Sequence, residues 1–355
     1  MSPRSTKNNK PEIKKWEAFP ARTSFNETVK NTARKHLFPA DNGVITAMKM
    51  INVANGPQNV SGIILGCMRM PALSAEDAAG MIRTAAEEGV NFFDHATCYG
   101  DGEAETRFGD AFPQSGLKRE DVILQSKCGL HFDRKEFDWS REDILASAEA
   151  SLRRLKTEYL DVLLLHRPDL LFDPEEVAEA FEQLAVSGKV RHFGVSNVTP
   201  GQLELLRKYV RQPLVFNQLQ FSLDQTQLID GGLYLNNLTT DRSISRDNGV
   251  LDYCRLHGIT IQAWSPLQFG MFGGCFIDHP DFPELNRVLG ELGEKYGVSK
   301  AAIAIAWILR HPARMQAIAG TMNPAHLRDI CAASGVSLTH QEWYQLYLAS
   351  GKFLP

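Results

Sequence analysis

The stretch YLDVLLLHRPDLLFDPEEVAEAFEQLAVSGKVRHFGVS, residues 159–196, contains one complete strand–helix–strand unit. Its first apolar run, Tyr159–His166, and its last, Val190–Ser196, have the length and the branched side chains of buried strands. Between them the sequence DPEE at 173–176 is typical of a helix start, with a capping carboxylate followed by proline. Because buried parallel strands are joined by crossover helices, the stretch predicts two parallel strands of one sheet.

The same alternation continues from residue 63 to residue 319. It predicts eight strands: Ile63–Gly66, Asn91–Asp94, Val122–Lys127, Tyr159–His166, Val190–Ser196, Leu214–Gln218, Ile259–Trp264 and Met315–Ala319. Further helix starts are indicated by Ser74 with Asp77, Ser140 with Asp143, Thr199-Pro200, and Ser299 before Lys300–Arg310. Eight such units in one run predict an α/β fold of the (β/α)8 (TIM) barrel type. The competing doubly wound sheet usually has five or six strands and a glycine-rich first turn.

Three segments lie outside this repeat. Ala47–Val60, with Asn55-Gly56 at its centre, predicts a hairpin that closes the barrel floor, and Thr339–Ser350 predicts an extra C-terminal helix. Residues 222–249 are polar and have no periodicity, so we expect a long loop that is either functional or disordered. Residues 43–355 should therefore form a single barrel domain.

The composition narrows the classes of function. With 43% hydrophobic and 23% charged residues, the 355-residue chain resembles a soluble globular protein. A net charge of −4 gives no general attraction to nucleic acid or anionic lipid, and no apolar run is long enough to span a membrane. The six cysteines show no paired spacing, which favours reduced thiols and a cytoplasmic location.

The first 42 residues differ from the rest in charge. They hold nine Lys or Arg and four Asp or Glu. We expect residues 1–42 to be a flexible basic extension, with a mitochondrial transit peptide as the alternative.

Four polar side chains lie at or just past the ends of three consecutive predicted strands: Asp94, Tyr99, Lys127 and His166. Strand C-termini of a parallel barrel open onto one face, so these groups should meet there. A free phenol has a pKa of about 10, and a cation within about 4–6 Å can lower that value by one or more units. Lys127 can lower the pKa of Tyr99 in this way, and Asp94 can hold the Lys127 ammonium in place as an ion pair. Such a site can protonate or polarise a carbonyl group.

A carbonyl that is activated by a proton donor still needs an electron source, and no side chain supplies hydride. The chain should therefore bind a nicotinamide cofactor. The ends of the fifth and sixth predicted strands, GVSN at 194–197 and Asn217-Gln218, place amide and hydroxyl groups on the same rim. Trp264 can stack on a flat ring, and GTMNP at 320–324 leads into a helix whose N-terminus favours a phosphate.

The signatures Asp94/Tyr99-Gly100, Ser126-Lys127, HRPD at 166–169 and GVSN at 194–197 stand in the order found in aldo-keto reductases. The chain resembles this family over roughly residues 44–350. Its SKCG at 126–129 and HRPD are similar to a bacterial oxidoreductase-type subgroup.

The resemblance implies NAD(P)H-dependent reduction of an aldehyde or ketone to an alcohol. Tyr99 is then the proton donor, Lys127 and Asp94 tune it, and His166 orients the carbonyl. The cofactor contacts that it implies are Ser196, Asn197 and Gln218 at the carboxamide, Trp264 on the ring, Ser265, Leu267 and Gly270 over the pyrophosphate, and Thr321, Met322, Asn323 and His326 at the adenosine end.

The residues expected to bind the 2′-phosphate of NADPH depart from the family pattern. Many members place Lys or Arg there to select NADPH, whereas Gly320, Thr321 and His326 are not permanently cationic. NADPH is the expected cofactor and NADH is the alternative. The substrate should be a small carbonyl compound, selected by loops that include Met68–Leu73, Gly129–Trp139 and residues 222–249. No metal is expected, and the sequence does not indicate an oligomeric state.

Other interpretations stay open at this stage. The same barrel could serve as a cofactor-binding regulatory or redox-sensing subunit. A lyase or isomerase could use Lys127 as a Schiff-base amine, although Asp94 would keep that lysine charged. Cys67, Cys98 and Cys128 lie near the predicted catalytic rim, either as redox-sensitive thiols or as ordinary buried side chains.

Overall fold

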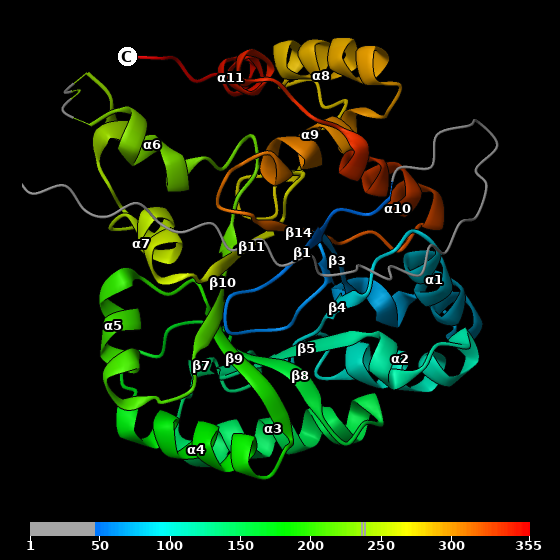
Figure 1. The fold of residues 1–355 in the computed structure, drawn as a ribbon, viewed down its shortest axis with the longest axis vertical. Helices are drawn as coiled ribbons and strands as arrows, with labels where there is room; N and C mark the ends of the chain where they lie inside the picture. The colour runs from blue at the N-terminus through cyan, green and yellow to red at the C-terminus, as the bar shows by residue number, and fades with distance from the viewer. Residues whose placement is uncertain (1–46, 236, 238) are drawn as a thin grey trace, which may run out of the picture.

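Eight parallel strands close into a barrel in the computed structural model, which describes residues 47–355 except 236 and 238 (Figure 1). The strands are β3 (Ile63–Gly66), β4 (Phe92–Asp94), β5 (Ile123–Cys128), β8 (Leu160–Leu165), β9 (Val190–Ser196), β10 (Leu214–Gln220), β11 (Thr260–Trp264) and β14 (Gln316–Ala319). Each pairs with its neighbour in chain order, and β14 returns to pair with β3. The predicted (β/α)8 barrel is confirmed. The basic extension at residues 1–42 lies outside the described residues.

Helices surround the barrel (Figure 1). They are α1 (Ala75–Glu87), α2 (Glu103–Ser115), α3 (Arg141–Leu155), α4 (Pro174–Val186), α5 (Pro200–Tyr209), α6 (Gln227–Leu233), α7 (Val250–His257), α8 (Pro283–Tyr296), α9 (Lys300–Leu309), α10 (Pro324–Cys331) and α11 (His340–Ala349). The predicted starts of five of them are confirmed, because a side chain caps a backbone N–H at Ser74, Ser140, Asp173, Thr199 and Ser299. None of the described helices has both the length and the apolar character needed to cross a membrane.

The segment at residues 222–249 differs from the expected loop. It contains helix α6 and a 3-10 turn, Asp241–Ser243. Buried Asp230 of α6 accepts a hydrogen bond of 2.7 Å from Tyr347 of α11 and forms an ion pair of 2.7 Å with Arg242. These partners are distant or irregularly spaced in sequence, so local periodicity could not reveal the helix.

Three two-stranded sheets complete the fold. β1 (Met50–Ile51) pairs with β2 (Val60–Ser61), which confirms the predicted hairpin before the first barrel strand. The other two, β6 (Leu130–His131) with β7 (Glu136–Phe137) and β12 (Gln268–Phe269) with β13 (Gly274–Cys275), lie in the loops after β5 and β11. Both therefore belong to the rim at the C-terminal ends of the strands.

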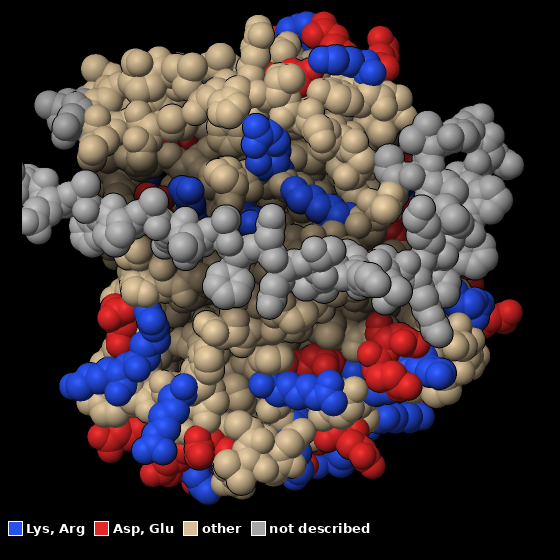
Figure 2. Space-filling model, in the orientation of Figure 1, with Lys and Arg blue, Asp and Glu red and all other residues tan. Residues whose placement is uncertain are grey.

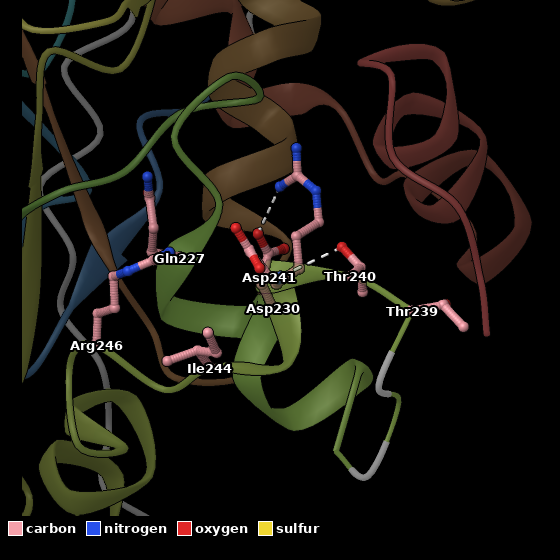
Figure 3. Close-up of a pocket in the computed structure, with 8 residues that line it drawn as sticks. Gln227, Asp230, Thr239, Thr240, Asp241, Ile244 and Arg246 are labelled. Carbon is pink, nitrogen blue, oxygen red and sulfur yellow. Dashed lines mark hydrogen bonds and ion pairs between the residues drawn. The ribbon is translucent and has the colours of Figure 1, made fainter.

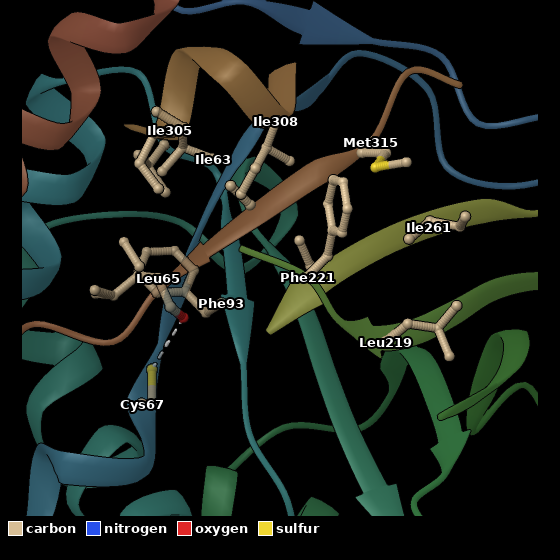
Figure 4. Close-up of a cluster of buried hydrophobic side chains, with 14 of the residues drawn as sticks. Ile63, Leu65, Cys67, Phe93, Leu219, Phe221, Ile261, Ile305, Ile308 and Met315 are labelled. Atoms are coloured by element: carbon tan, nitrogen blue, oxygen red, sulfur yellow. Dashed lines mark hydrogen bonds between the residues drawn. The ribbon is translucent and has the colours of Figure 1, made fainter. Parts of the chain in front are cut away.

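The strands alternate between two apolar clusters. Ile63 and Leu65 of β3 belong to the cluster that also contains Ile305 and Ile308 of α9 (Figure 4). Ile64, between them, belongs to a separate cluster with strand and floor-hairpin residues such as Phe92, Phe216 and Val60. This two-residue period places one face of each strand against the helices and the other inside the barrel.

Amide side chains interrupt the apolar filling of the barrel. Gln316 Nε2 donates to the backbone oxygen of Ser61 at 2.8 Å, and Gln262 Nε2 donates to Gln316 Oε1 at 3.1 Å. Gln125 Nε2 lies 2.9 Å from Gln262 Oε1 and 2.6 Å from Asp94 Oδ1. A hydrogen-bonded chain thus connects the floor hairpin to the carboxylate at the end of β4.

The contact between α2 and α3 depends on the missing side chain of Gly109. A Cβ atom there would lie 2.2 Å from the backbone oxygen of Arg154 and 3.0 Å from the backbone carbon of Leu155. We expect Gly109→Ala to lower the free energy of unfolding by about 1–3 kcal/mol, because backbone atoms cannot rotate away as a side chain can. Urea denaturation measures this change.

Gly201 of α5 is the matched control, because a Cβ atom there meets nothing within 4 Å. Gly201→Ala should leave stability unchanged or raise it by about 0.5–1 kcal/mol. Equal effects of the two substitutions would contradict the steric explanation.

Candidate active site

A buried ammonium group joins the predicted acid and carboxylate. Lys127 Nζ, at the end of β5, lies 2.8 Å from Asp94 Oδ2 and 3.0 Å from Tyr99 Oη. Its third hydrogen bond goes to the backbone oxygen of His95 at 2.8 Å. The ammonium has three N–H groups, so each has a partner although the side chain is 0% exposed.

Hydrogen bonds to both carboxylate oxygens hold Asp94 in place. Lys127 binds Oδ2, while Gln125 Nε2 at 2.6 Å and Gln218 Nε2 at 3.1 Å donate to Oδ1. Three donors thus share the two oxygens of one carboxylate. The pair of opposite charges is thus solvated by protein groups instead of water.

The proton on Tyr99 is held more firmly than the sequence predicted. Burial raises the pKa of Tyr99, Lys127 offsets part of that rise, and the resulting pKa is about 12. The expected net lowering of the phenol pKa is therefore wrong for the described chain. For Lys127, burial lowers the pKa, but Asp94 and Tyr99 outweigh it and raise the value above the ordinary one. At neutral pH the phenol keeps its proton and the amine keeps its charge.

His166 lies beside Tyr99 with the two rings edge to face, at a centroid distance of 5.9 Å. Burial, followed by the charges of Lys127 and Arg167, holds the pKa of His166 well below its usual range. The imidazole is neutral at pH 7. A neutral imidazole can donate a hydrogen bond to a carbonyl oxygen without taking the proton of the acid.

The residues expected at the carboxamide lie together on the rim. Asn197 Nδ2 donates to Ser196 Oγ at 2.7 Å, and Trp264 Nε1 donates to Asn197 Oδ1 at 3.0 Å. Ser196 Oγ donates in turn to the backbone oxygen of Gln218 at 2.9 Å. The structure thus brings these four residues, from the ends of β9, β10 and β11, into one hydrogen-bonded group.

The residues expected over the pyrophosphate follow β11. Ser265 Oγ donates to Gln268 Oε1 at 2.9 Å, and Leu267 packs against the core next to the β12–β13 hairpin. Gly270 lies in that hairpin with a φ of 56°, and its N–H donates to Asp224 Oδ2 at 3.1 Å. A positive φ favours glycine at this turn.

The residues expected at the adenosine end follow β14. Thr321, Met322 and Asn323 form the connection to α10, and His326 lies in the first turn of that helix. Asn323 Oδ1 caps the helix by accepting from the N–H of Ala325 at 2.9 Å. The N-terminus of a helix favours an anion, so the position of these residues is compatible with the adenosine end of the dinucleotide that the sequence predicts.

Two arginines near these residues were not predicted as contacts. Arg69, in the 3-10 helix Cys67–Ala72 that follows β3, donates to the backbone oxygen of Gly320 at 2.9 Å and places a cation beside the connection to α10. The half-buried guanidinium of Arg167 lies 5.6 Å from the Trp264 ring. The HRPD motif at 166–169 could have indicated Arg167 as a site residue. Arg69 is 251 residues from Gly320 in the sequence, and no motif indicates that the two meet. Arg328 pairs with Glu87, the last residue of α1, and with Glu88, which follows it.

A separate pocket of about 650 Å³ lies within the segment at residues 222–249 (Figure 3). Its lining residues are Gln227, Asp230, Thr239, Thr240, Asp241, Arg242, Ile244 and Arg246. It contains none of the predicted site residues. Two of its lining residues, Asp230 and Arg242, form an ion pair of 2.7 Å with each other.

Comparisons with known proteins identify the family of the chain. The family model described as "Aldo/keto reductase family" matches residues 62–347. The uncharacterized oxidoreductase YcsN of Bacillus subtilis is 34% identical over 317 residues, which cover 85% of this chain and 98% of the relative. A 6-dehydroglucose reductase of Agrobacterium fabrum is 34% identical, with 76% of this chain and 87% of the relative covered.

More distant relatives extend the comparison. A putative voltage-gated potassium channel subunit beta of Schizosaccharomyces pombe is 27% identical, with 71% of this chain and 77% of the relative covered. Among solved structures, an aldo/keto reductase from Klebsiella pneumoniae in complex with NADP and acetate is similar with a TM-score of 0.65 and 26% identity. That match covers 84% of this chain and 94% of the other. On the family model and the 34% identity of two relatives, the chain belongs to the aldo/keto reductase family.

Proposed function

We propose that this protein reduces an aldehyde or ketone to an alcohol with NADPH, and that Tyr99 is the general acid. The observation that carries the proposal is the buried Lys127 ammonium, which contacts both Tyr99 Oη and Asp94 Oδ2. When bound, the reduced nicotinamide supplies the hydride that the carbonyl carbon receives. The carbonyl oxygen then needs one proton, and the phenol supplies it.

The neighbours of Tyr99 lower the cost of giving up this proton. The phenolate that forms lies 3.0 Å from the Lys127 ammonium, so its charge is stabilised at the moment it appears. Asp94 keeps the ammonium fixed and His166 donates to the carbonyl oxygen. The high pKa of Tyr99 in the resting chain prevents premature loss of the proton.

NADPH is our preferred cofactor, with NADH as the alternative. The Klebsiella pneumoniae reductases of similar structure hold NADP or NADPH. Arg69 adds a cation near Gly320, where the sequence lacked one. We propose that Ser196, Asn197, Gln218 and Trp264 hold the nicotinamide end, that Ser265, Leu267 and Gly270 cover the pyrophosphate, and that Thr321, Met322, Asn323 and His326 contact the adenosine end.

Sugar aldehydes belong in the substrate panel, since relatives of 34% and 30% identity are 6-dehydroglucose reductases. We also propose a cytoplasmic location and no nucleic-acid partner. Figure 2 shows Lys and Arg interspersed with Asp and Glu over the helices at the lower edge of the drawn face, and the net charge of the chain is −4.

The second candidate is a cofactor-binding regulatory subunit, which the channel-subunit relative favours. Steady turnover of simple aldehydes separates the two functions, because an enzyme cycles while a sensor releases its cofactor slowly. The Schiff-base interpretation is weaker still: the raised pKa of Lys127 keeps its amine protonated and therefore not nucleophilic.

Tyr99→Phe should reduce kcat for aldehyde reduction by about 10²–10⁴-fold, the usual contribution of a general acid. The ring and its packing remain, so NADPH affinity should change little. Loss of NADPH absorbance measures turnover, and fluorescence titration measures cofactor binding. Unchanged turnover would contradict the assignment of the acid.

Trp264→Ala should weaken NADPH binding by about 5- to 30-fold, because the indole face and the hydrogen bond to Asn197 are both lost. Its circular dichroism spectrum should match the parent, since Trp264 is only half-buried. Trp343→Phe, on α11, is the control for the loss of a tryptophan signal. Equal NADPH affinity in Trp264→Ala and the parent protein would count against stacking.

A further inference from the structure

A cysteine side chain contacts the imidazole of the proposed active site. Cys98 lies between Thr97 and Tyr99 in the loop after β4, and it is 8% exposed. Its Sγ atom lies 3.4 Å from His166 Nδ1, within hydrogen-bond distance for sulfur. Among the described residues, no second hydrogen bond is made by the imidazole ring or by this thiol. Within the described residues, the Cys98–His166 contact is therefore the hydrogen bond that acts on the ring.

The protonation states of the two groups limit the possible arrangements. Burial raises the pKa of the Cys98 thiol to about 11 and holds the pKa of His166 well below its usual range. At neutral pH the thiol keeps its proton, and the neutral imidazole carries one N–H. The contact can then have two arrangements. In the first, the thiol S–H donates to Nδ1 and the ring proton is on Nε2. In the second, Nδ1–H donates to the sulfur and Nε2 carries no proton.

The role proposed for His166 selects the first arrangement. A bare Nε2 could only accept a hydrogen bond, whereas a protonated Nε2 can donate one to a carbonyl oxygen. The thiol at Nδ1 allows this tautomer, because S–H can donate to the bare Nδ1.

We propose that Cys98 is a positioning residue, whose thiol donates to His166 Nδ1 and thereby keeps the imidazole proton on Nε2 to face the carbonyl oxygen. This inference rests on the proposed function, in which His166 orients the carbonyl. It also assigns Cys98 a different part from the redox-sensing thiol that the sequence left open. A thiol that stays protonated reacts slowly with oxidants, because the thiolate is the reactive form.

The test measures the tautomer directly. Protein labelled with ¹⁵N at histidine, in complex with NADP⁺, gives ring nitrogen signals in which a protonated and a bare nitrogen are well separated. His166→Asn serves to assign the signals of His166. We expect Nε2 to be protonated in the parent protein and in Cys98→Ser, whose hydroxyl can still donate. In Cys98→Val, which fills the site without a donor, the two tautomers should both be populated.

Turnover should follow the tautomer. We expect Cys98→Val to lower kcat by about 3- to 10-fold, the effect of one hydrogen bond, with Cys98→Ser recovering most of the loss. The KM for NADPH should not change. Cys67→Ala is the matched control, since this buried rim thiol donates to the backbone oxygen of Leu65 and, among the described residues, makes no hydrogen bond to His166. It should leave both the tautomer and kcat as in the parent.

Several results would overturn the proposal. One is a proton on Nδ1 in the parent protein; another is a tautomer in Cys98→Val identical to the parent, even if kcat falls, because packing would then explain the loss. If Cys98→Val does not fold, Cys98→Ala gives the same comparison. The tautomer is read without any substrate, so a confirmed tautomer in a protein that reduces no carbonyl would refute the proposed function and leave the Cys98–His166 bond established.

Discussion

The site depends on one constraint, which is that a lysine charge must be kept inside the barrel without water. An unpaired ammonium there would cost several kcal/mol, and it would lose its proton instead of staying charged. Asp94, Tyr99 and the backbone oxygen of His95 use all three N–H groups of Lys127. The orientation of Tyr99 follows from this requirement, because the phenol oxygen is one of the three acceptors. The hydrogen bonds that compensate the Lys127 charge are thus also the ones that place the Tyr99 hydroxyl.

The carboxylate that balances this lysine is itself held by a chain of amides. Gln125 and Gln218 donate to Asp94 Oδ1, and Gln262 connects Gln125 to Gln316 near the floor hairpin. The chain includes side chains of five strands, β4, β5, β10, β11 and β14. Amides that are hydrogen-bonded to one another in a low-dielectric interior have few alternative arrangements. These amides occupy positions near the barrel axis where apolar side chains would otherwise pack, and they fix the position of the Asp94 carboxylate.

The strands and the four catalytic candidates could be predicted because their signals are local. Runs such as Val162–Leu165 are buried on both faces, and each polar residue at a strand end must lie on the same rim. Two features could not be predicted this way. Helix α6 is held by Tyr347, over 100 residues away, and Arg69 reaches Gly320 only because β14 closes the barrel against β3. The pKa of Tyr99 also escaped prediction, since the degree of burial depends on packing that spacing does not contain.

The loops of the rim are not independent of one another. Lys352, in the C-terminal segment, donates to the backbone oxygens of Leu223 at 2.6 Å and Asp224 at 3.1 Å. The Asp224 carboxylate accepts the N–H of Gly270, the residue that we place over the pyrophosphate. The C-terminus, the segment at residues 222–249 and the hairpin after β11 are therefore one connected unit. A change that displaces Asp224 therefore also removes a hydrogen bond from the hairpin that we propose covers the pyrophosphate.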